Sequence, residues 1–333
     1  ERDRPKVVGI SAMTETYPNA LRIAKTVKEF DPAVAVVMGG PHPTLLPEEV
    51  ALQDAVDVVV VGEGEETMVE LCGSLIRGSG PLATVKGIVF QQDGLVRTPS
   101  RPAMDPDSLP IPARELFPLE LYRDPWNVLT SRGSCPFRCP FCSVPSIWEG
   151  KARRLSRSPK SIVSEIEFLI RAHAAHYVFF TDDVFTLQKS WVYQVLEELE
   201  KLQFPLSWGC ATRVDLVNEP LLKAMAAAGC KSVQFGVETG ASEFMGTVKH
   251  IGKEQVLSAV ECAAETGIEP LCSFIVPFPQ DTEATLRETM TFMKEISEVG
   301  GRILLSYLAP YPGTEFYKRA DELGLTIVAN DWD

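Results

Sequence analysis

The second half of the chain repeats a short apolar run followed by a helical pattern. The runs are rich in β-branched and aromatic residues, as buried strands are, and lie at residues 126–131, 177–181, 206–212, 232–237, 269–276 and 302–309. Helical patterns fill the gaps near residues 159–172, 190–201, 219–228, 253–266 and 283–298. Ser158 and Asn218, each with Pro in the following turn, mark two helix starts. Six successive βα units predict an α/β fold, a partial (β/α)6 barrel rather than a full barrel of eight.

The first part of the chain shows a shorter alternation of the same kind. Apolar runs at 6–10, 33–38 and 56–61 predict buried strands. Helical patterns follow them at 17–30, at 47–52 and from about residue 65 to Ile76. This order predicts a doubly wound, Rossmann-like domain with a parallel sheet, only part of which is present. We expect its missing strands to precede Glu1.

The region between these two patterns predicts a connector. Residues 85–98 have the pattern of a β-hairpin that turns at Asp93-Gly94, and a proline-rich stretch with little periodicity follows from about 99 to 125. We therefore predict four segments. They are a Rossmann-like domain at 1–80, a hairpin and linker at 81–125, the partial barrel at 126–320, and the start of a truncated C-terminal region at 321–333.

Charge and hydropathy narrow the class of protein. The formal net charge of −13 disfavours unassisted binding to nucleic acid or to an anionic membrane surface. No apolar stretch approaches the length of about 18 residues expected of a membrane span, and no secretory signal is visible. We expect a cytoplasmic enzyme with no membrane span and no nucleic-acid partner.

Three of the eight cysteines are clustered: Cys135, Cys139 and Cys142, with the spacing C-x3-C-x2-C. The other five occur singly in apolar or helical stretches, where small buried residues are expected. Clustered thiolates are soft ligands that suit zinc or an iron–sulfur cluster. Structural zinc prefers four protein ligands, and no fourth cysteine or histidine is near. Three cysteines on an iron–sulfur cluster instead leave one iron open to a substrate or cofactor.

Charged residues follow several of the predicted barrel strands. Asp182 and Asp183 follow the second strand, Arg213 and Asp215 the third, and Glu238 the fourth. The segments 277–281 and 310–313 follow the last two strands. Because active sites collect at the carboxyl ends of parallel strands, these residues and the cysteine loop are predicted to converge.

The cysteine spacing, with Phe141 before the last cysteine and a barrel strand before the loop, closely resembles the radical S-adenosylmethionine (SAM) superfamily. The resemblance implies a [4Fe–4S] cluster on Cys135, Cys139 and Cys142, with SAM bound to the unique iron. One electron then cleaves SAM to a 5′-deoxyadenosyl radical. The implied SAM contacts are Phe141, Asp182, Asp183, Arg213, Glu238 and Tyr311. For Asp183 and Asp215, an ion pair between neighbouring strand ends is an equal alternative.

Two further stretches resemble sequence patterns of the family, one of them less closely than the other. Residues 276–289 resemble its G-x-P-G-E-T stretch but depart at Pro277, Gln280 and Asp281, so their residues are not assigned. Residues 309–317 match the turn after the last strand, where a tight Pro-Gly turn is the alternative to a contact with adenine.

The loops after the three front strands together resemble the cobalamin-binding half of one large radical SAM subgroup. The implied cobalamin contacts are Ser11, Met13, Gly39, Gly40, His42, Thr44, Gly62 and Gly64. We interpret His42 as an anchor of the glycine loop rather than a cobalt ligand, and Glu63 and Glu65 as caps of the next helix. The family's optional cobalt-ligand motif would precede Glu1.

The resemblance implies a cobalamin-dependent radical SAM enzyme that most often C-methylates an unactivated carbon. In that reaction a methyl group from methylcobalamin, remade from a second SAM, reaches the carbon radical. The runner-up keeps the cofactors but cyclises, rearranges or oxidises its substrate. A methylthiotransferase is disfavoured because residues 1–70 contain no cysteine, and a non-catalytic metal-binding module is the last alternative. The implied partners are a small-molecule or natural-product substrate and an external electron donor of flavodoxin or ferredoxin type.

Overall fold

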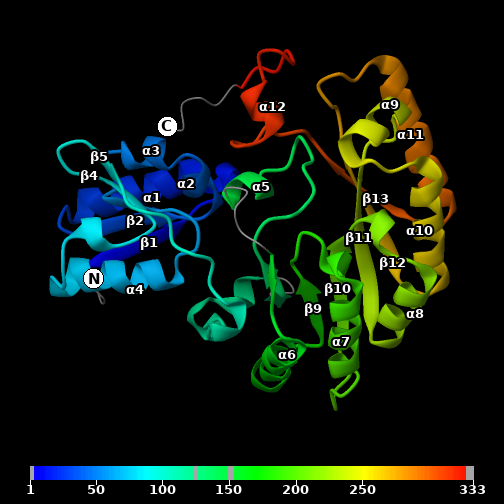
Figure 1. Ribbon diagram of the computed structural model, residues 1–333, viewed down its shortest axis with the longest axis horizontal. Helices are drawn as coiled ribbons and strands as arrows, with labels where there is room; N and C mark the ends of the chain where they lie inside the picture. Colours follow the sequence, from blue (N-terminus) through cyan, green and yellow to red (C-terminus); the bar gives the residue numbers. More distant parts are fainter. Residues whose placement is uncertain (1–3, 123–125, 149–153, 328–333) are drawn as a thin grey trace. The chain divides into compact units, whose positions relative to one another are not determined.

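A computed structural model describes residues 4–122, 126–148 and 154–327 (Figure 1). The chain divides into two compact units. The N-terminal unit comprises Glu1–Met104, Pro136–Arg153 and Pro310–Asp333, and the barrel unit comprises Asp105–Cys135 and Arg154–Ala309. Cys135 therefore belongs to the barrel unit, whereas Cys139 and Cys142 belong to the N-terminal unit.

The N-terminal unit is built on a five-stranded sheet in the order β1-β2-β3-β4-β5. The strands are β1 (Val7–Ser11), β2 (Ala35–Gly39), β3 (Val58–Val60), β4 (Ile88–Gln91) and β5 (Leu95–Arg97). The first three are parallel, as predicted. The predicted hairpin, β4 and β5, adds to β3 in antiparallel register and so extends the same sheet.

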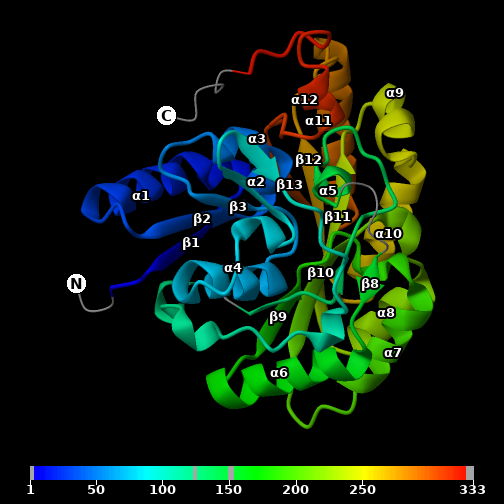
Figure 2. The same cartoon turned by 60° about the vertical axis from the view of Figure 1, so that its left-hand side comes forward.

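Helices cover both faces of this sheet (Figure 2). The helices are α1 (Tyr17–Phe30), α2 (Pro41–Leu45), α3 (Pro47–Ala51) and α4 (Glu65–Arg77). Val36 and Met38 of β2 pack with residues of α1 and α3 in one core, whereas Val37 packs with Leu71 of α4 in a second core. This alternation follows from the two-residue period of a strand, and it produces the predicted doubly wound arrangement.

The barrel unit contains a six-stranded sheet in the order β13-β12-β11-β10-β9-β6. The strands are β6 (Asn127–Val128), β9 (Tyr177–Phe180), β10 (Ser207–Thr212), β11 (Cys230–Glu238), β12 (Glu269–Ile275) and β13 (Arg302–Ser306). Every neighbouring pair is parallel, which confirms the predicted open sheet of six βα units.

Five helices follow these strands in chain order (Figure 1). They are α6 (Pro159–His173), α7 (Lys189–Leu199), α8 (Glu219–Ala227), α10 (Lys253–Glu265) and α11 (Glu283–Glu298), within one or two residues of the predicted ranges. The side chains of Ser158 and Asn218 accept hydrogen bonds from the first turns of α6 and α8, which confirms both predicted starts. The shared core contains the fully buried Phe180, Trp208 and Phe235.

Short elements escaped the sequence patterns. They are β7 (Ser131–Arg132), β8 (Leu155–Ser156), α5 (Val144–Ile147), α9 (Ser242–Phe244), a π-helix (Met245–Lys249), α12 (Glu315–Lys318) and 3-10 turns at Thr14–Thr16, Leu82–Thr84, Pro106–Ser108, Arg114–Leu116, Leu119–Leu121, Phe185–Leu187 and Val214–Leu216. The predicted strand 126–131 is shorter than expected. It ends at Val128 because Asp182 takes the Thr130 amide, and Ser131 then pairs with β8.

The helices in the described part of the chain include none with both the length and the apolar character that a bilayer span requires.

Candidate active site

The cysteine loop follows β7 and leads into α5. Cys135, Cys139 and Cys142 are thiols rather than disulfides, and each is partly exposed. The backbone N–H of Cys142 donates to the carbonyl of Cys139 at 3.0 Å, so these two cysteines share one tight turn. Among the residues that the structure describes, no three His, Cys, Asp or Glu side chains form a ready-made metal site. The donor set of three accessible thiols on one loop fits an iron–sulfur cluster in its chemistry.

Within the N-terminal unit, the turn after the last strand supports the cysteine loop. The Phe316 N–H donates to the Pro140 carbonyl at 3.2 Å, and Ser146 Oγ donates to the Gly313 carbonyl at 2.7 Å. Gly313 has φ 82°, and a Cβ there would lie 2.9 Å from the Ser146 Cβ. The Pro-Gly turn is therefore shaped by its close approach to the loop.

Tyr311, a predicted SAM contact, lies in the same turn. Its hydroxyl donates to Glu15, which belongs to the 3-10 turn after β1. Burial and then the Glu15 carboxylate raise the pKa of Tyr311 to about 12. The structure thus joins Tyr311 to the loop that carries Met13, a contact that no sequence pattern indicated.

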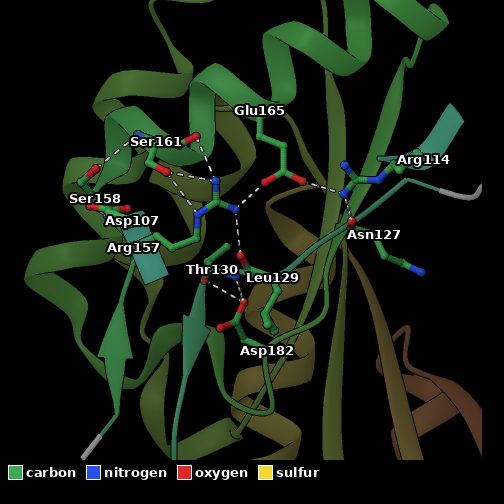
Figure 3. Close-up of polar contacts among 10 residues, drawn as sticks. All are labelled: Asp107, Arg114, Asn127, Leu129, Thr130, Arg157, Ser158, Ser161, Glu165 and Asp182. Carbon is green, nitrogen blue, oxygen red and sulfur yellow. Dashed lines mark hydrogen bonds and ion pairs between the residues drawn. The ribbon is translucent and has the colours of Figure 1, made fainter. Parts of the chain in front are cut away.

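In the barrel unit, Asp182 lies at the end of β9 with 3% of its surface exposed. Its carboxylate accepts from the Thr130 N–H at 3.0 Å and the Thr130 hydroxyl at 2.7 Å (Figure 3). It also accepts from the Ser131 hydroxyl. Arg154 adds an ion pair at 3.5 Å. Asp182 therefore fixes the residues that precede the cysteine loop, a role that the predicted SAM contact does not include.

Asp183, the next predicted SAM contact, is more exposed than Asp182. Desolvation of its carboxyl group, and then the charge of Asp182, raise its pKa, while Arg154 opposes the shift. Two adjacent carboxylates of this kind favour a cationic partner.

Arg213 at the end of β10 is 5% exposed and makes a two-pronged ion pair with Asp215, at 2.8 and 2.9 Å. Its Nη2 also donates to the Lys249 carbonyl at 2.7 Å. Asp215 thus pairs with the arginine of its own strand end, whereas sequence analysis considered an ion pair between neighbouring strand ends. Asp215 therefore holds the guanidinium at the strand end.

Glu238 ends β11 in a left-handed conformation, with φ 72°. Its carboxylate pairs with Lys249 Nζ at 3.2 Å, yet burial raises its pKa against this pairing. A Cβ at Gly236 would lie 2.5 Å from Glu238 Oε1 and 2.7 Å from Lys249 Nζ. Glycine at 236 therefore makes room for the pair, and strain in Glu238 is held by its surroundings.

Lys249 was missed by sequence analysis because residues 241–252 carry no periodic pattern. It lies at the end of the π-helix, and such bulges are frequent at functional sites. With Arg213, Asp215 and Glu238 it forms a set of two cations and two anions, all buried except the partly exposed Asp215, which we call the strand-end quartet. A zwitterionic amino acid needs partners of both signs, so the quartet fits SAM in its chemistry.

The three front loops are tied to one another. The Ala12 N–H donates to the Gly39 carbonyl at 2.9 Å, the His42 N–H to the Ala12 carbonyl at 3.1 Å, and the Gly62 N–H to Thr44 Oγ1 at 3.0 Å. Gly40 has φ 96°, and a Cβ there would lie 2.7 Å from Ser11 Oγ.

Open space adjoins these tied loops. Nothing lies within 4 Å of a Cβ placed at Gly62, and the nearest contact at Gly64 is an ordinary 3.6 Å. The Met13 side chain is 57% exposed beside them. A tight backbone with open space over it fits a bulky ligand such as cobalamin.

His42 lies in α2 and is fully buried. Its ring stacks on Tyr17 with centroids 4.1 Å apart, and Nδ1 lies 3.3 Å from Thr14 Oγ1. Burial lowers the pKa of His42 to about 4, so the imidazole is neutral at pH 7. These contacts support the interpretation of His42 as a loop anchor.

The two glutamates of the third loop differ. Glu63 Oε2 accepts from the Met104 N–H at 3.0 Å, a contact with the linker rather than the predicted helix cap, whereas Glu65 opens the first turn of α4. Carboxylates at this position suit the positive end of a helix.

Comparisons with known proteins agree with these observations. The radical SAM superfamily pattern matches residues 131–293, and the B12 binding domain pattern matches residues 1–72. An uncharacterised methyltransferase of Pyrococcus horikoshii is 35% identical over 98% of this chain and 72% of its own length. The anaerobic magnesium-protoporphyrin IX monomethyl ester cyclase of Rubrivivax gelatinosus is 32% identical over 88% of this chain, which spans about half (54%) of that relative.

Solved structures share the fold. The radical SAM methyltransferase TsrM of Kitasatospora setae aligns with a TM-score of 0.79 at 20% identity, over 96% of this chain and 66% of its own. The cobalamin-dependent SAM radical enzyme OxsB aligns with a TM-score of 0.80 at 17% identity, over 99% of this chain and 55% of its own.

The two matched domains bring with them the family's cofactors, which are SAM and a [4Fe–4S] cluster for the radical SAM domain and cobalamin for the B12 domain. The arrangement of strands, the cysteine loop and the tied front loops agree with both matches. The chain belongs to the family of radical SAM enzymes that carry a cobalamin-binding domain.

Proposed function

We propose that this protein is a cobalamin-dependent radical SAM enzyme that methylates an unactivated carbon of a small-molecule substrate. The observation that carries the proposal is the strand-end quartet: Arg213, Glu238 and Lys249 are buried and Asp215 is partly buried, beside the carboxyl ends of β10 and β11 in a six-stranded partial barrel. Buried charges of both signs at this edge suit the amino and carboxylate groups of SAM better than they suit a purely structural core.

The proposal assigns roles to the chain's own residues. Cys135, Cys139 and Cys142 would hold the cluster. Phe141, Asp182, Asp183, Arg213, Glu238 and Tyr311 would contact SAM, with Lys249 holding Glu238 in place. Ser11, Met13, Gly39, Gly40, Thr44, Gly62 and Gly64 would contact cobalamin, while His42 anchors their loop. When bound, these cofactors supply one-electron cleavage of SAM and a methyl group; the protein orients the reactants and excludes water.

A cyclase or oxidising enzyme with the same cofactors is the second candidate. It is favoured by one observation, the 32% identity to the Rubrivivax gelatinosus cyclase. We further propose an external electron donor of flavodoxin or ferredoxin type and a cytoplasmic location, as the family relation implies.

The test is anaerobic reconstitution with iron, sulfide and hydroxocobalamin, followed by incubation with SAM and a reductant. Mass spectrometry then measures 5′-deoxyadenosine, S-adenosylhomocysteine and retained cobalamin. We expect all three, with 5′-deoxyadenosine lost in Cys139→Ala but kept in Cys262→Ala, since Cys262 is a lone, partly exposed cysteine on α10.

The outcomes separate the candidates. 5′-Deoxyadenosine without S-adenosylhomocysteine would favour the cyclase, because methyl transfer converts SAM to S-adenosylhomocysteine. Neither product from a protein that retains its cluster would overturn the radical SAM assignment of activity.

A further inference from the structure

The six-stranded sheet ends at β6, which pairs on one side only among the strands that the structure describes. Its carbonyls point alternately to the two sides, as in any strand. The carbonyls of Trp126 and Val128 accept from β9, from the Phe179 N–H at 3.0 Å and the Thr181 N–H at 3.1 Å. The carbonyls of Asn127 and Leu129 therefore face away from β9, toward the open edge.

Two arginines occupy this edge (Figure 3). Arg114 Nη2 donates to the Asn127 carbonyl at 2.7 Å, and Arg157 Nη1 donates to the Leu129 carbonyl at 3.1 Å. The same two nitrogens donate to one carboxylate, that of Glu165 on α6: Arg114 at 2.6 Å and Arg157 at shorter range. We call Arg114, Arg157 and Glu165 the edge clasp.

The edge clasp is buried and depends on its carboxylate. Glu165 is 2% exposed, and the side chains of Arg114 and Arg157 are 12% and 14% exposed. One anion between two guanidinium groups holds both, and removing it would leave two buried cations facing each other. Arg114 Nη1 is buried and has no hydrogen-bond partner among the described residues. The two hydrogen bonds of Nη2, to Asn127 and Glu165, therefore fix the position of the Arg114 guanidinium.

Contacts along the chain continue the restraint toward the cysteine loop. Arg157 is fixed to the first turn of α6 through the Ser161 carbonyl at 3.1 Å, and its own N–H donates to the Thr130 carbonyl at 2.8 Å. Asp182 takes the Thr130 N–H and the Ser131 hydroxyl. From Asn127 to Ser131, the backbone is thus held by Arg114 and Arg157 at the open edge, and by Asp182 and β8 nearer the cysteine loop.

We propose that Glu165 is a positioning residue for the cysteine loop. Through Arg114 and Arg157 it fixes the strand from which the chain passes to Cys135. The effect of Glu165 on a bound cluster rests on the proposed function. The restraint that Glu165 places on the backbone before Cys135 does not depend on any cofactor. The simpler alternative is that the clasp only protects a sheet edge from pairing with another chain.

The variants are Glu165→Gln and Arg114→Lys. Lysine keeps the charge but cannot bridge a carboxylate and a carbonyl in the fixed geometry of a guanidinium. The matched control is Arg302→Lys, in the exposed pair of Arg302 with Glu269. If Glu165→Gln does not fold, a triple variant with Glu165→Leu, Arg114→Met and Arg157→Met replaces the buried ions by apolar groups of similar volume, which proteins often tolerate.

The first readout is hydrogen–deuterium exchange of the full-length, metal-free protein. We expect amides of residues 127–135 to exchange about tenfold faster in both variants and at the wild-type rate in the control. An increase that stops before Arg132, or no increase in a folded variant, overturns the proposal.

The second readout is the electron paramagnetic resonance spectrum of the reduced cluster with and without SAM. We expect the spectral change on SAM addition to be lost or broadened in the variants at equal iron content. If the variants exchange faster but give wild-type spectra, the edge clasp only protects the sheet edge, and the positioning role of Glu165 is overturned. If the wild-type protein itself binds no cluster, the proposed function fails, while the exchange experiment still decides whether the clasp positions the loop.

Discussion

Replacement of Gly236 by alanine tests the strand-end quartet at its tightest point. The added methyl would lie 2.5 Å from Glu238 Oε1 and 2.7 Å from Lys249 Nζ, inside any normal contact distance. Overpacking a core costs about 1–3 kcal/mol. Complete loss of one partner of a buried ion pair costs about 3–5 kcal/mol. Because the lysine chain can withdraw partway, we expect the free energy of unfolding to fall by about 2–3 kcal/mol.

The assay is urea unfolding followed by tryptophan fluorescence, since Trp208 is fully buried in the barrel core. The matched control is Gly246→Ala in the neighbouring π-helix, where a Cβ meets nothing within 4 Å. The control should be neutral or up to about 1 kcal/mol more stable, because alanine restricts the unfolded chain. If the free energies of unfolding of the two variants differ by less than about 0.5 kcal/mol, Glu238 and Lys249 are not tightly packed against Gly236, and a preformed charged site at this strand end is refuted.

Three further predictions follow from the front loops and from β9. Because burial lowers the pKa of His42 from 6.5 to about 4, the folded state resists its protonation. The neutral form of His42 therefore stabilises the folded state fully above pH 6.5, and up to about 3 kcal/mol of the free energy of unfolding is lost as pH falls toward 4. In His42→Gln, the free energy of unfolding measured in urea should depend less on pH over this range. An unchanged pH dependence would contradict the lowered pKa of His42. Gly40→Ala should cost about 3 kcal/mol and reduce cobalamin retention measured by visible absorbance, whereas Gly64→Ala should cost under about 1 kcal/mol; equal costs would refute the steric argument. Asp182→Asn turns an amide toward donors and should cost about 3 kcal/mol in urea unfolding, and a loss below about 1 kcal/mol would show that these bonds are weak.

The regular elements could be predicted from the sequence because their signals are local. The helix 283–298 was predicted from its helical pattern with the bounds that the structure has, and the structure shows Thr282 capping its first turn. The six barrel strands and their parallel order likewise follow from apolar runs separated by helices. Such patterns span many residues and tolerate exceptions.

The parts that escaped prediction depend on distant partners or on very short segments. The helix α2 has five residues, too few to show a period. Lys249 lies in a π-helix and pairs with Glu238 at the end of β11. Glu165 on α6 pairs with Arg114, which lies in the proline-rich stretch 51 residues earlier. The candidate residues at strand ends were found because topology places them there, but Lys249, the ion-pair partner of Glu238, was not, because that pairing is decided by side-chain packing.

The tied front loops also limit how this domain can change over evolutionary time. Hydrogen bonds join Ala12 of the first loop to Gly39 and His42 of the second, and Gly62 of the third loop to Thr44 of the second. A substitution that reshapes the second loop removes partners from the other two, so single replacements there carry a cost that matched sets avoid. Grafting a different ligand preference onto this domain would therefore require the three loops to be exchanged together as one inherited block.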